Sequence, residues 1–278
     1  MGKIDLHIHT TASDGRFSPS EIVQQAQSNG MEIIAITDHD ALEGIWEALQ
    51  AAEAYPWLTI IPGVEINTDV PNGEVHILGY FIDYLNKELQ DVLRKLRSSR
   101  VERAKKMVDK LKRLNVNIDM ERVQQIAGNG TIGRPHIAEA ILEKKYISNF
   151  KEAFTRYIGR GGPAYVEREK ITPVEAVKLV IRAGGLPVFG HPLTCENPEA
   201  MSSELKPAGL AGMEVYYNGY TEKDINTLLK IAKKYDLIPT GGSDYHGIDA
   251  NSETMMGNVT VPDEDVQRFI LAARNSKR

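Results

Sequence analysis

The sequence predicts an α/β fold, a closed or nearly closed parallel barrel that carries a helical insertion. Short β-branched runs alternate with helical stretches at both ends of the 278-residue chain, which is typical of strand–helix units. The middle of the chain instead repeats apolar residues at helical spacing. Polar clusters rich in histidine follow several predicted strands, and the rim of a parallel barrel would bring such clusters together.

The first 85 residues are expected to form four strands and two helices. The strands are predicted at 4–8, 32–37, 58–66 and 75–82. Ser18–Glu21 has the pattern of a capping box with proline in the first turn, so it predicts the start of a helix. That helix is expected to end near Asn29, and a second helix is expected at 42–54.

Residues 86–164 are predicted to be a helical insertion that shapes the substrate site. Apolar residues recur every three to five positions from Leu89 to Leu114, and arginine and lysine crowd the other face. Shorter helices are expected at 120–127, 135–144 and 150–157, and a strand signal returns at 164–166. Residues 1–85 and 165–278 are therefore expected to form the barrel.

After the insertion the strand–helix alternation resumes. A second capping box at Thr172–Glu175 predicts a helix that reaches Arg182. Further elements are expected as strands at 186–189, 212–217 and 237–240 and as a helix at 222–235.

Charge is distributed unevenly. Residues 86–170 hold 20 Lys and Arg against 11 Asp and Glu, a net charge of +9, whereas the rest of the chain carries −14. An acidic body with a basic middle segment suits a metal site that faces an anionic substrate, although a solvated basic helix is the alternative. The one cysteine, Cys195, excludes an intrachain disulfide. A cytoplasmic protein is expected, with no membrane contact and no evident obligate protein partner.

All seven histidines lie in short polar clusters that hold carboxylates rather than thiolates. The clusters are Asp5–His9, Thr37–Asp40, Val75–Ile77, Gly133–His136, Gly190–Pro192 and Ser243–His246. The spacing of His7 and His9 points both imidazoles to one face of a strand. Glu65 is an acid inside an apolar strand, so it needs a strong partner. Any one of these residues could be a satisfied core position, but together they predict a metal-dependent hydrolase.

Several of these motifs resemble, in the same order, those of the PHP (polymerase and histidinol phosphatase) superfamily. They are His7-Ile8-His9, Asp14-Gly15, Thr37-Asp38-His39, Gly63-Val64-Glu65 and Gly242-Ser243-Asp244-Tyr245-His246. The resemblance covers nearly the whole chain. It implies a distorted (β/α)7 barrel, three divalent metal ions (manganese, zinc or iron) and phosphoester hydrolysis by a metal-bound hydroxide.

The resemblance also implies three ligand sets, carried over position by position. They are His7, His9, Glu65 and Asp244; Glu65, as a bridge, with His76 and His191; and Asp14, His39 and His246. Asp38 is expected to orient a ligand rather than to bind a metal ion. The group that protonates the leaving oxygen stays open between a water, His191 and a residue of the insertion.

The insertion is expected to select the substrate. Arg134 and His136 stand at a proline-initiated helix start, where a guanidinium and free backbone N–H groups would bind phosphate; an ordinary helix start is the alternative. Arg100, Arg103 and Arg160 are weaker candidates. Base stacking could use three tyrosines, which are Tyr157, Tyr165 and Tyr217.

Gly133–His136 and Tyr157–Val166 resemble a subfamily of nucleoside 3′,5′-bisphosphate phosphatases and 5′–3′ exoribonucleases that trim short 5′-phosphorylated RNA. The resemblance implies a small anionic nucleotide or short RNA as substrate. Two alternatives are histidinol-phosphate phosphatase and a non-catalytic, metal-stabilised PHP module. The 20 cationic side chains of residues 86–170 favour a nucleotide over one small monophosphate. The complete ligand set counts against a non-catalytic module.

Overall fold

Seven strands form one sheet in the computed structural model, which describes residues 3–68, 70, 75–128, 130–167, 171–248 and 254–276. The strands lie side by side in chain order. Their bounds are β1 (Lys3–Ile8), β2 (Met31–Ile36), β3 (Thr59–Asn67), β4 (His76–Tyr80), β5 (Leu186–Gly190), β6 (Gly212–Tyr217) and β7 (Ile238–Gly242). The predicted α/β fold with a seven-stranded, barrel-shaped sheet is confirmed.

The two ends of the sheet approach each other just beyond β7. The amide of His9 donates to the carbonyl of Tyr245 at 2.9 Å, and the amide of Tyr245 donates to the carbonyl of His7 at 3.2 Å. Gly242 allows this approach, because a Cβ atom there would lie 2.5 Å from the Cβ of His7. Barrel closure therefore brings the ends of β1 and β7 together.

The strand–helix alternation predicts a parallel sheet, and this prediction is wrong for one strand. β4 pairs antiparallel with both β3 and β5, whereas the other neighbouring pairs are parallel. Only eight residues separate β3 from β4, and a parallel crossover needs roughly a dozen or more. Because β4 runs in reverse, its first residue, His76, pairs with Asn67 at the end of β3 and with Gly190 at the end of β5.

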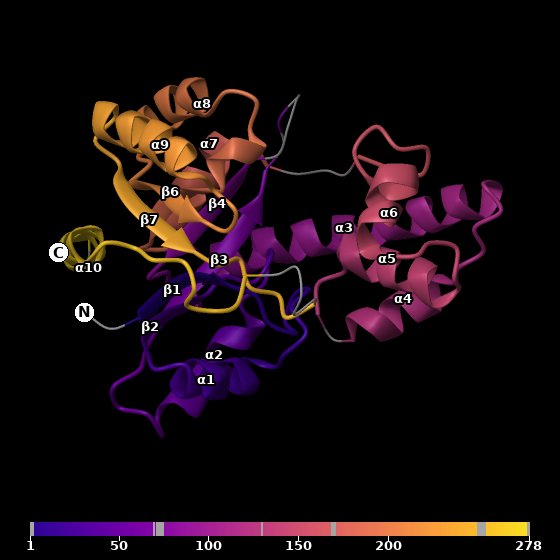
Figure 1. Cartoon of the computed structure of the whole chain (residues 1–278), viewed down its shortest axis with the longest axis horizontal. Helices are drawn as coiled ribbons and strands as arrows, with labels where there is room; N and C mark the ends of the chain where they lie inside the picture. The colour runs from indigo at the N-terminus through magenta and orange to yellow at the C-terminus, as the bar shows by residue number, and fades with distance from the viewer. Residues whose placement is uncertain are drawn as a thin grey trace.

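Among the described residues, six helices accompany the strands of the barrel (Figure 1). They are α1 (Pro19–Ser28), α2 (Glu43–Ala52), α7 (Pro173–Arg182), α8 (Pro198–Leu205), α9 (Glu222–Lys234) and α10 (Asp263–Ser276), with short 3₁₀ turns at Pro192–Thr194 and Lys206–Ala208. The capping boxes that begin at Ser18 and Thr172 are both present. The sequence interpretation did not include α8 and α10.

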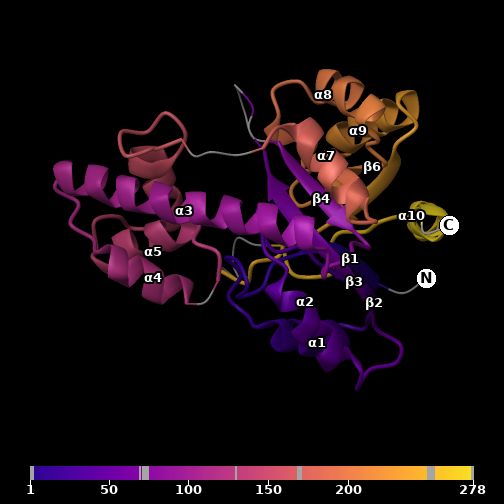
Figure 2. The same ribbon diagram turned by 180° about the vertical axis from the view of Figure 1, so that it is seen from behind.

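The basic middle of the chain forms helices beside the barrel. They are α3 (Lys87–Arg113), α4 (Met120–Ala127), α5 (Arg134–Glu143), α6 (Phe150–Ala153) and a one-turn π-helix, η1 (Phe154–Ile158). Figure 2 shows α3 running from the barrel to the other helices. The strand expected at 164–166 is absent, because Ala164 donates to the carbonyl of Tyr157 and Tyr165 donates to that of Gly162 in local turns.

Two apolar cores hold these parts together. The larger core fills the barrel and the space under its helices, and it includes residues from Ile4 to Ala273. The smaller core lies among α3 to α6, between Ala104 and Ala164. Among the described residues, no helix combines the length and apolar character that crossing a bilayer requires.

Candidate metal centre

The rim of the barrel gathers the nine residues expected to bind metal. Four of them, His9, His39, His191 and Asp244, follow a strand directly or within three residues. Within the described residues, three groups place their donor atoms within 4.8 Å of one another. The groups are His7, His9, Glu65 and Asp244; His39, Glu65 and His76; and His9, Asp14, His39 and His246.

Glu65 lies at the centre of these groups. Its carboxylate contacts five imidazoles, at distances of 3.4 Å for His7, 3.2 Å for His9, 2.9 Å for His39, 2.6 Å for His76 and 2.8 Å for His191. Its side chain is 1% exposed. Glu65 therefore has the strong partners expected of an acid in an apolar strand. These histidines come from both halves of the chain.

The donor atoms themselves fit metal ions. Six buried ligand atoms have no hydrogen bond of good geometry among the described residues and instead lie against one another: His7 Nε2, His9 Nε2, Asp14 Oδ1, His39 Nδ1, Glu65 Oε2 and Asp244 Oδ1. A buried polar atom without a hydrogen bond costs about 1–3 kcal/mol, so six such atoms in one place fit the binding of cations. Imidazole and carboxylate donors without thiolates suit manganese, zinc or iron.

The carboxylates of the site are held in their ionised form. Burial raises the pKa of Glu65, but the charges of His39 and His76 outweigh burial and hold that pKa well below its usual value. Burial also acts on His246 by lowering its pKa, yet Asp244 and Asp14 raise it to about 10. The ionised carboxylates attract positive charge, which imidazolium rings or bound divalent ions can supply.

Glu214 supports two of the candidate ligands and was missed in the sequence. It is fully buried in β6, and its two carboxylate oxygens accept from His7 Nδ1 at 2.9 Å and from the amide of His191 at 2.7 Å. Such an outer carboxylate fixes the tautomer and ring orientation of a ligating histidine. The signal was available, since Glu214 is an acid in an apolar strand like Glu65.

Asp38 turns its carboxylate to the loop after β1. It accepts hydrogen bonds from the amide and hydroxyl of Thr10, both at 2.8 Å, and from the hydroxyl of Ser13 at 2.5 Å. Burial raises the pKa of Asp38 above its ordinary value. These contacts fix the loop that holds His9 and Asp14, in keeping with the expected orienting role.

Three rim residues adopt a left-handed backbone although they are not glycine. Asp40 has φ 51°, His191 has φ 26° and Asp244 has φ 54°. Such conformations cost of order 1–3 kcal/mol each and persist where the surroundings impose them. Their concentration at the strand ends indicates that the fold holds these side chains in place at an energetic cost.

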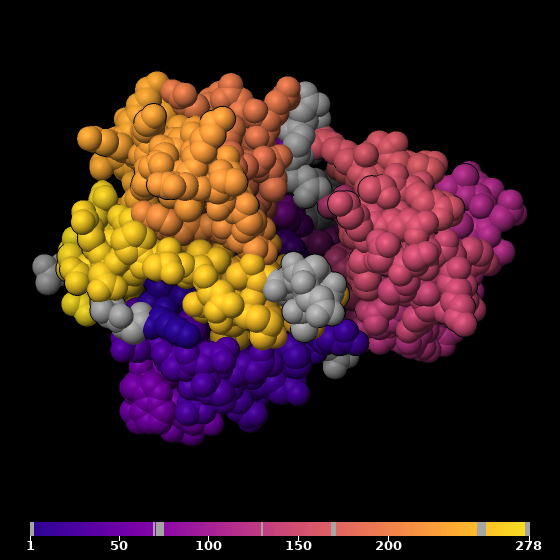
Figure 3. Space-filling model, in the orientation of Figure 1, coloured from indigo at the N-terminus to yellow at the C-terminus, as the bar shows by residue number. Residues whose placement is uncertain are grey.

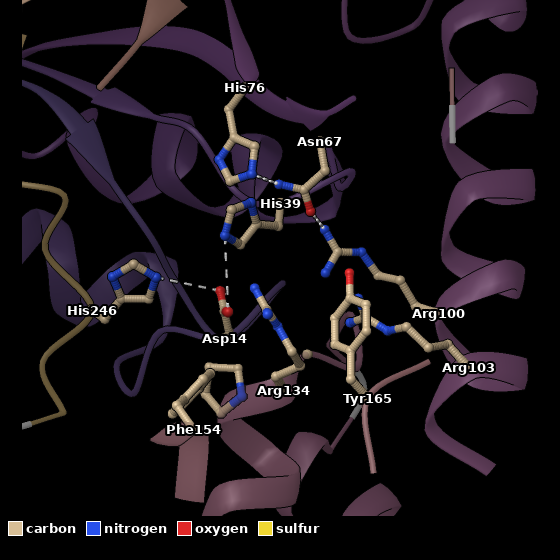
Figure 4. Close-up of a pocket in the computed structure, with 12 residues that line it drawn as sticks. Asp14, His39, Asn67, His76, Arg100, Arg103, Arg134, Phe154, Tyr165 and His246 are labelled. Carbon is tan, nitrogen blue, oxygen red and sulfur yellow. Dashed lines mark hydrogen bonds and ion pairs between the residues drawn. The ribbon is translucent and has the colours of Figure 1, made fainter. Parts of the chain in front are cut away.

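The clusters face a cavity between the barrel and the helices (Figure 3). Its volume is about 180 Å³. One wall carries Asp14 and three histidines, and the other carries three arginines, as Figure 4 shows. The histidines are His39, His76 and His246, and the arginines are Arg100, Arg103 and Arg134. The cavity thus combines candidate metal ligands with fixed positive charge.

Arg100 connects α3 to a candidate ligand. It is 4% exposed, its Nε donates to Asp40 Oδ2 at 2.8 Å, and a terminal nitrogen donates to the side-chain oxygen of Asn67. The amide nitrogen of Asn67 lies 2.5 Å from His76 Nε2. Because arginine can only donate, it fixes the orientation of the Asn67 amide. A helix residue therefore helps to position His76.

The residues expected to bind the substrate lie in different surroundings in the structure. Arg134 begins α5 and lines the cavity, with its guanidinium 5.7 Å from the ring centroid of Phe154. His136 is not among the residues lining this cavity, and its Nδ1 accepts from the amide of Gly133 at 3.0 Å as a helix cap. Arg160 donates to the carbonyl of Val70 at 3.0 Å.

The three tyrosines considered for base stacking also lie in different surroundings. Tyr165 lines the cavity. Tyr217 instead donates its hydroxyl to Asp244 Oδ2 at 2.7 Å, and Tyr157 packs against the small core beside Arg156. Of the described aromatic residues, Phe154 joins Tyr165 on the cavity wall, and no sequence motif marks it.

Comparison with known proteins gives a consistent set of relatives. A family model for the PHP domain matches residues 5–159. A 5′–3′ exoribonuclease from Haemophilus influenzae is 34% identical over 248 residues, which are 88% of this chain and 90% of the relative. A 3′,5′-nucleoside bisphosphate phosphatase from Chromobacterium violaceum is 29% identical over 88% of each chain. The crystal structure of a protein assigned as a metal-dependent phosphoesterase from Bifidobacterium adolescentis has a TM-score of 0.88 and 30% identity, covering 96% of this chain and 95% of that one.

Proposed function

We propose that this chain, which belongs to the PHP domain family of metal-dependent phosphoesterases, hydrolyses phosphate esters of nucleotides. The substrate class is a nucleoside 3′,5′-bisphosphate, a short 5′-phosphorylated RNA, or both. The observation that carries the proposal is the cavity in which candidate metal ligands face Arg100, Arg103 and Arg134. Relatives of this chain bear both activities in their names.

The ligand assignment follows the three groups of donor atoms. His7, His9, Glu65 and Asp244 would hold one ion; Glu65, His76 and His191 a second; and Asp14, His39 and His246 a third, with His9 and His39 close enough to contribute to a neighbouring group. Divalent ions there would lower the pKa of water toward ~7 and offset the charge of the phosphate.

The arginine wall would bind the phosphates. Arg134 is half-buried at a helix start, where guanidinium and helix N-terminus both favour an anion. Arg103 is 8% exposed, so its charge is poorly screened by solvent. Arg100 is fixed by Asp40 and Asn67. A substrate with two phosphate groups can pair with more of these guanidinium groups than a simple monoester can.

Two alternatives follow from the same family. Histidinol phosphate carries one phosphate and needs fewer cations than this wall provides. A non-catalytic module would be stabilised by its metal ions alone, but the cavity gives a substrate access to Asp14, His39, His76 and His246. Both observations favour nucleotide hydrolysis.

A substrate panel tests the proposal. Purified protein loaded with Mn²⁺ is offered adenosine 3′,5′-bisphosphate, histidinol phosphate and a 5′-phosphorylated RNA oligomer, and phosphate and nucleotide release are measured. We expect turnover of the bisphosphate, the RNA or both, at least tenfold faster than that of histidinol phosphate. Preference for histidinol phosphate would support the first alternative, and no release from any of the three would support the second.

A further inference from the structure

A second cavity adjoins the arginine-lined cavity, between the helices and the barrel rim. Its volume is about 810 Å³, and small-molecule sites measure roughly 300–1,000 Å³. Pro135, Phe154 and His246 line both cavities, and Asp244 lines the second. Because the same residues line both, the two spaces lie next to each other beside the candidate metal ligands.

The two cavities differ in chemistry. The second has an apolar wall of Leu142, Phe150, Phe154 and Ile248. Its charged residues outside the metal centre are Arg16, Glu139 and Glu143, so the carboxylates outnumber the cation, and Glu143 already pairs with Arg122 at 2.6 Å. A phosphate is therefore better placed against the three arginines of the first cavity, and a flat, uncharged ring against the phenylalanines of the second.

We propose that the second cavity binds the nucleobase of the substrate, with its ring against Phe150, while the phosphates occupy the arginine-lined cavity. This inference rests on the proposed function and adds the feature that distinguishes nucleotides from other phosphate esters. Asn149 and Asn218 line the same space, and amide side chains offer the donor and acceptor that base edges require.

Phe150 and Phe154 have different places in this arrangement. Phe150 is the first residue of α6; it is half-buried and lines the second cavity but not the first. Phe154 starts the π-helix, lines both cavities and lies under the guanidinium of Arg134. Single π-helical turns recur at functional sites. The contact between Phe154 and Arg134 fixes the spacing between the aromatic wall and the phosphate-binding wall.

The base site is tested with two substrates that differ only in the base. Adenosine 3′,5′-bisphosphate is compared with the abasic methyl riboside 3′,5′-bisphosphate, and the ratio of their kcat/KM values is measured on the metal-loaded protein. Stacking on an aromatic side chain contributes about 1–3 kcal/mol, so we expect a preference of about 5- to 150-fold for adenosine.

Variants of Phe150 locate the effect. Phe150→Ala should bring the ratio toward one, and Phe150→Tyr should retain it. Because Phe150 also packs against the small core, Phe150→Leu is the second variant: it keeps apolar volume but lacks an aromatic face, and we expect the ratio to fall there too. Trp57→Ala removes an exposed aromatic side chain that lines neither cavity, and it should leave the ratio unchanged.

The outcomes separate the two proposals. Equal kcat/KM values for the two substrates in the wild type, or a wild-type ratio in folded Phe150→Leu, would overturn the base site. Equilibrium dialysis with the same two ligands repeats the comparison without turnover. Hydrolysis of neither bisphosphate nor the RNA oligomer would overturn the proposed function, whereas equal affinity for the two ligands would overturn the base site alone.

Discussion

Replacing Glu65 by glutamine tests the architecture of the metal centre. The substitution keeps the size of the side chain and removes its charge. Glu65 belongs to two of the three donor groups, and the group of His9, Asp14, His39 and His246 does not include it. We therefore expect the number of bound ions to fall from three per chain to one.

The catalytic loss should be large. Divalent ions contribute several kcal/mol to stabilising the transition state, and each 1.36 kcal/mol is a factor of ten in rate. Loss of two ions should lower kcat/KM for a phosphate ester by about 10³-fold or more. Metal content is measured by elemental analysis after dialysis, and turnover by phosphate release.

A matched variant controls for the loss of one carboxylate. Glu199→Gln removes an exposed acid that pairs with Lys234 on the barrel surface, and it should keep three ions and wild-type turnover. If Glu65→Gln also kept three ions and wild-type kcat/KM, the central position of Glu65 in the site would be refuted.

Three further substitutions probe the surroundings of the site. Arg134→Ala should lower kcat/KM by roughly 10- to 100-fold, since one charge-assisted hydrogen bond contributes about 1.5–3 kcal/mol, without loss of metal; unchanged kinetics would exclude it from the phosphate site. Arg100→Ala removes the guanidinium that pairs with buried Asp40 and should lower the free energy of unfolding in urea by about 3–5 kcal/mol; a change below 1 kcal/mol would contradict this. Tyr217→Phe removes the hydroxyl that donates to Asp244 and should weaken metal binding about 10- to 100-fold in a chelator titration; wild-type affinity would show that the contact is dispensable.

The features that could be predicted are those that the local sequence encodes. The period of a strand places His7 and His9 on one face, and the structure buries both rings with centroids 5.2 Å apart. The capping boxes at Ser18 and Thr172 predict helix starts, because the N-cap residue and its glutamate partner lie within four residues of each other. Glu65 predicted a strong partner, since an acid in an apolar strand requires one, but only the set of clusters predicted metal.

Some of the features that were missed depend on contacts between distant residues, and others had a local signal. Arg100 lies 60 positions from Asp40, and periodicity on α3 says nothing about which strand end its charge will meet. β4 runs in reverse because its connection to β3 is too short for a parallel crossover. The few residues between Asn67 and His76 therefore already indicated an antiparallel pair. The acidic first turn of α10, after Pro262, was likewise a usable helix signal.

Phosphoesterase activity of this chain is expected to depend on bound divalent ions. The most direct test is to strip the protein of metal, add Mn²⁺ back stepwise, and follow metal content and phosphate release from adenosine 3′,5′-bisphosphate together. We expect negligible release by the stripped protein and activity that rises with bound metal and saturates near three ions per chain. Full activity in the stripped protein, or no activity on this substrate or on a 5′-phosphorylated RNA oligomer at saturation, would contradict this expectation.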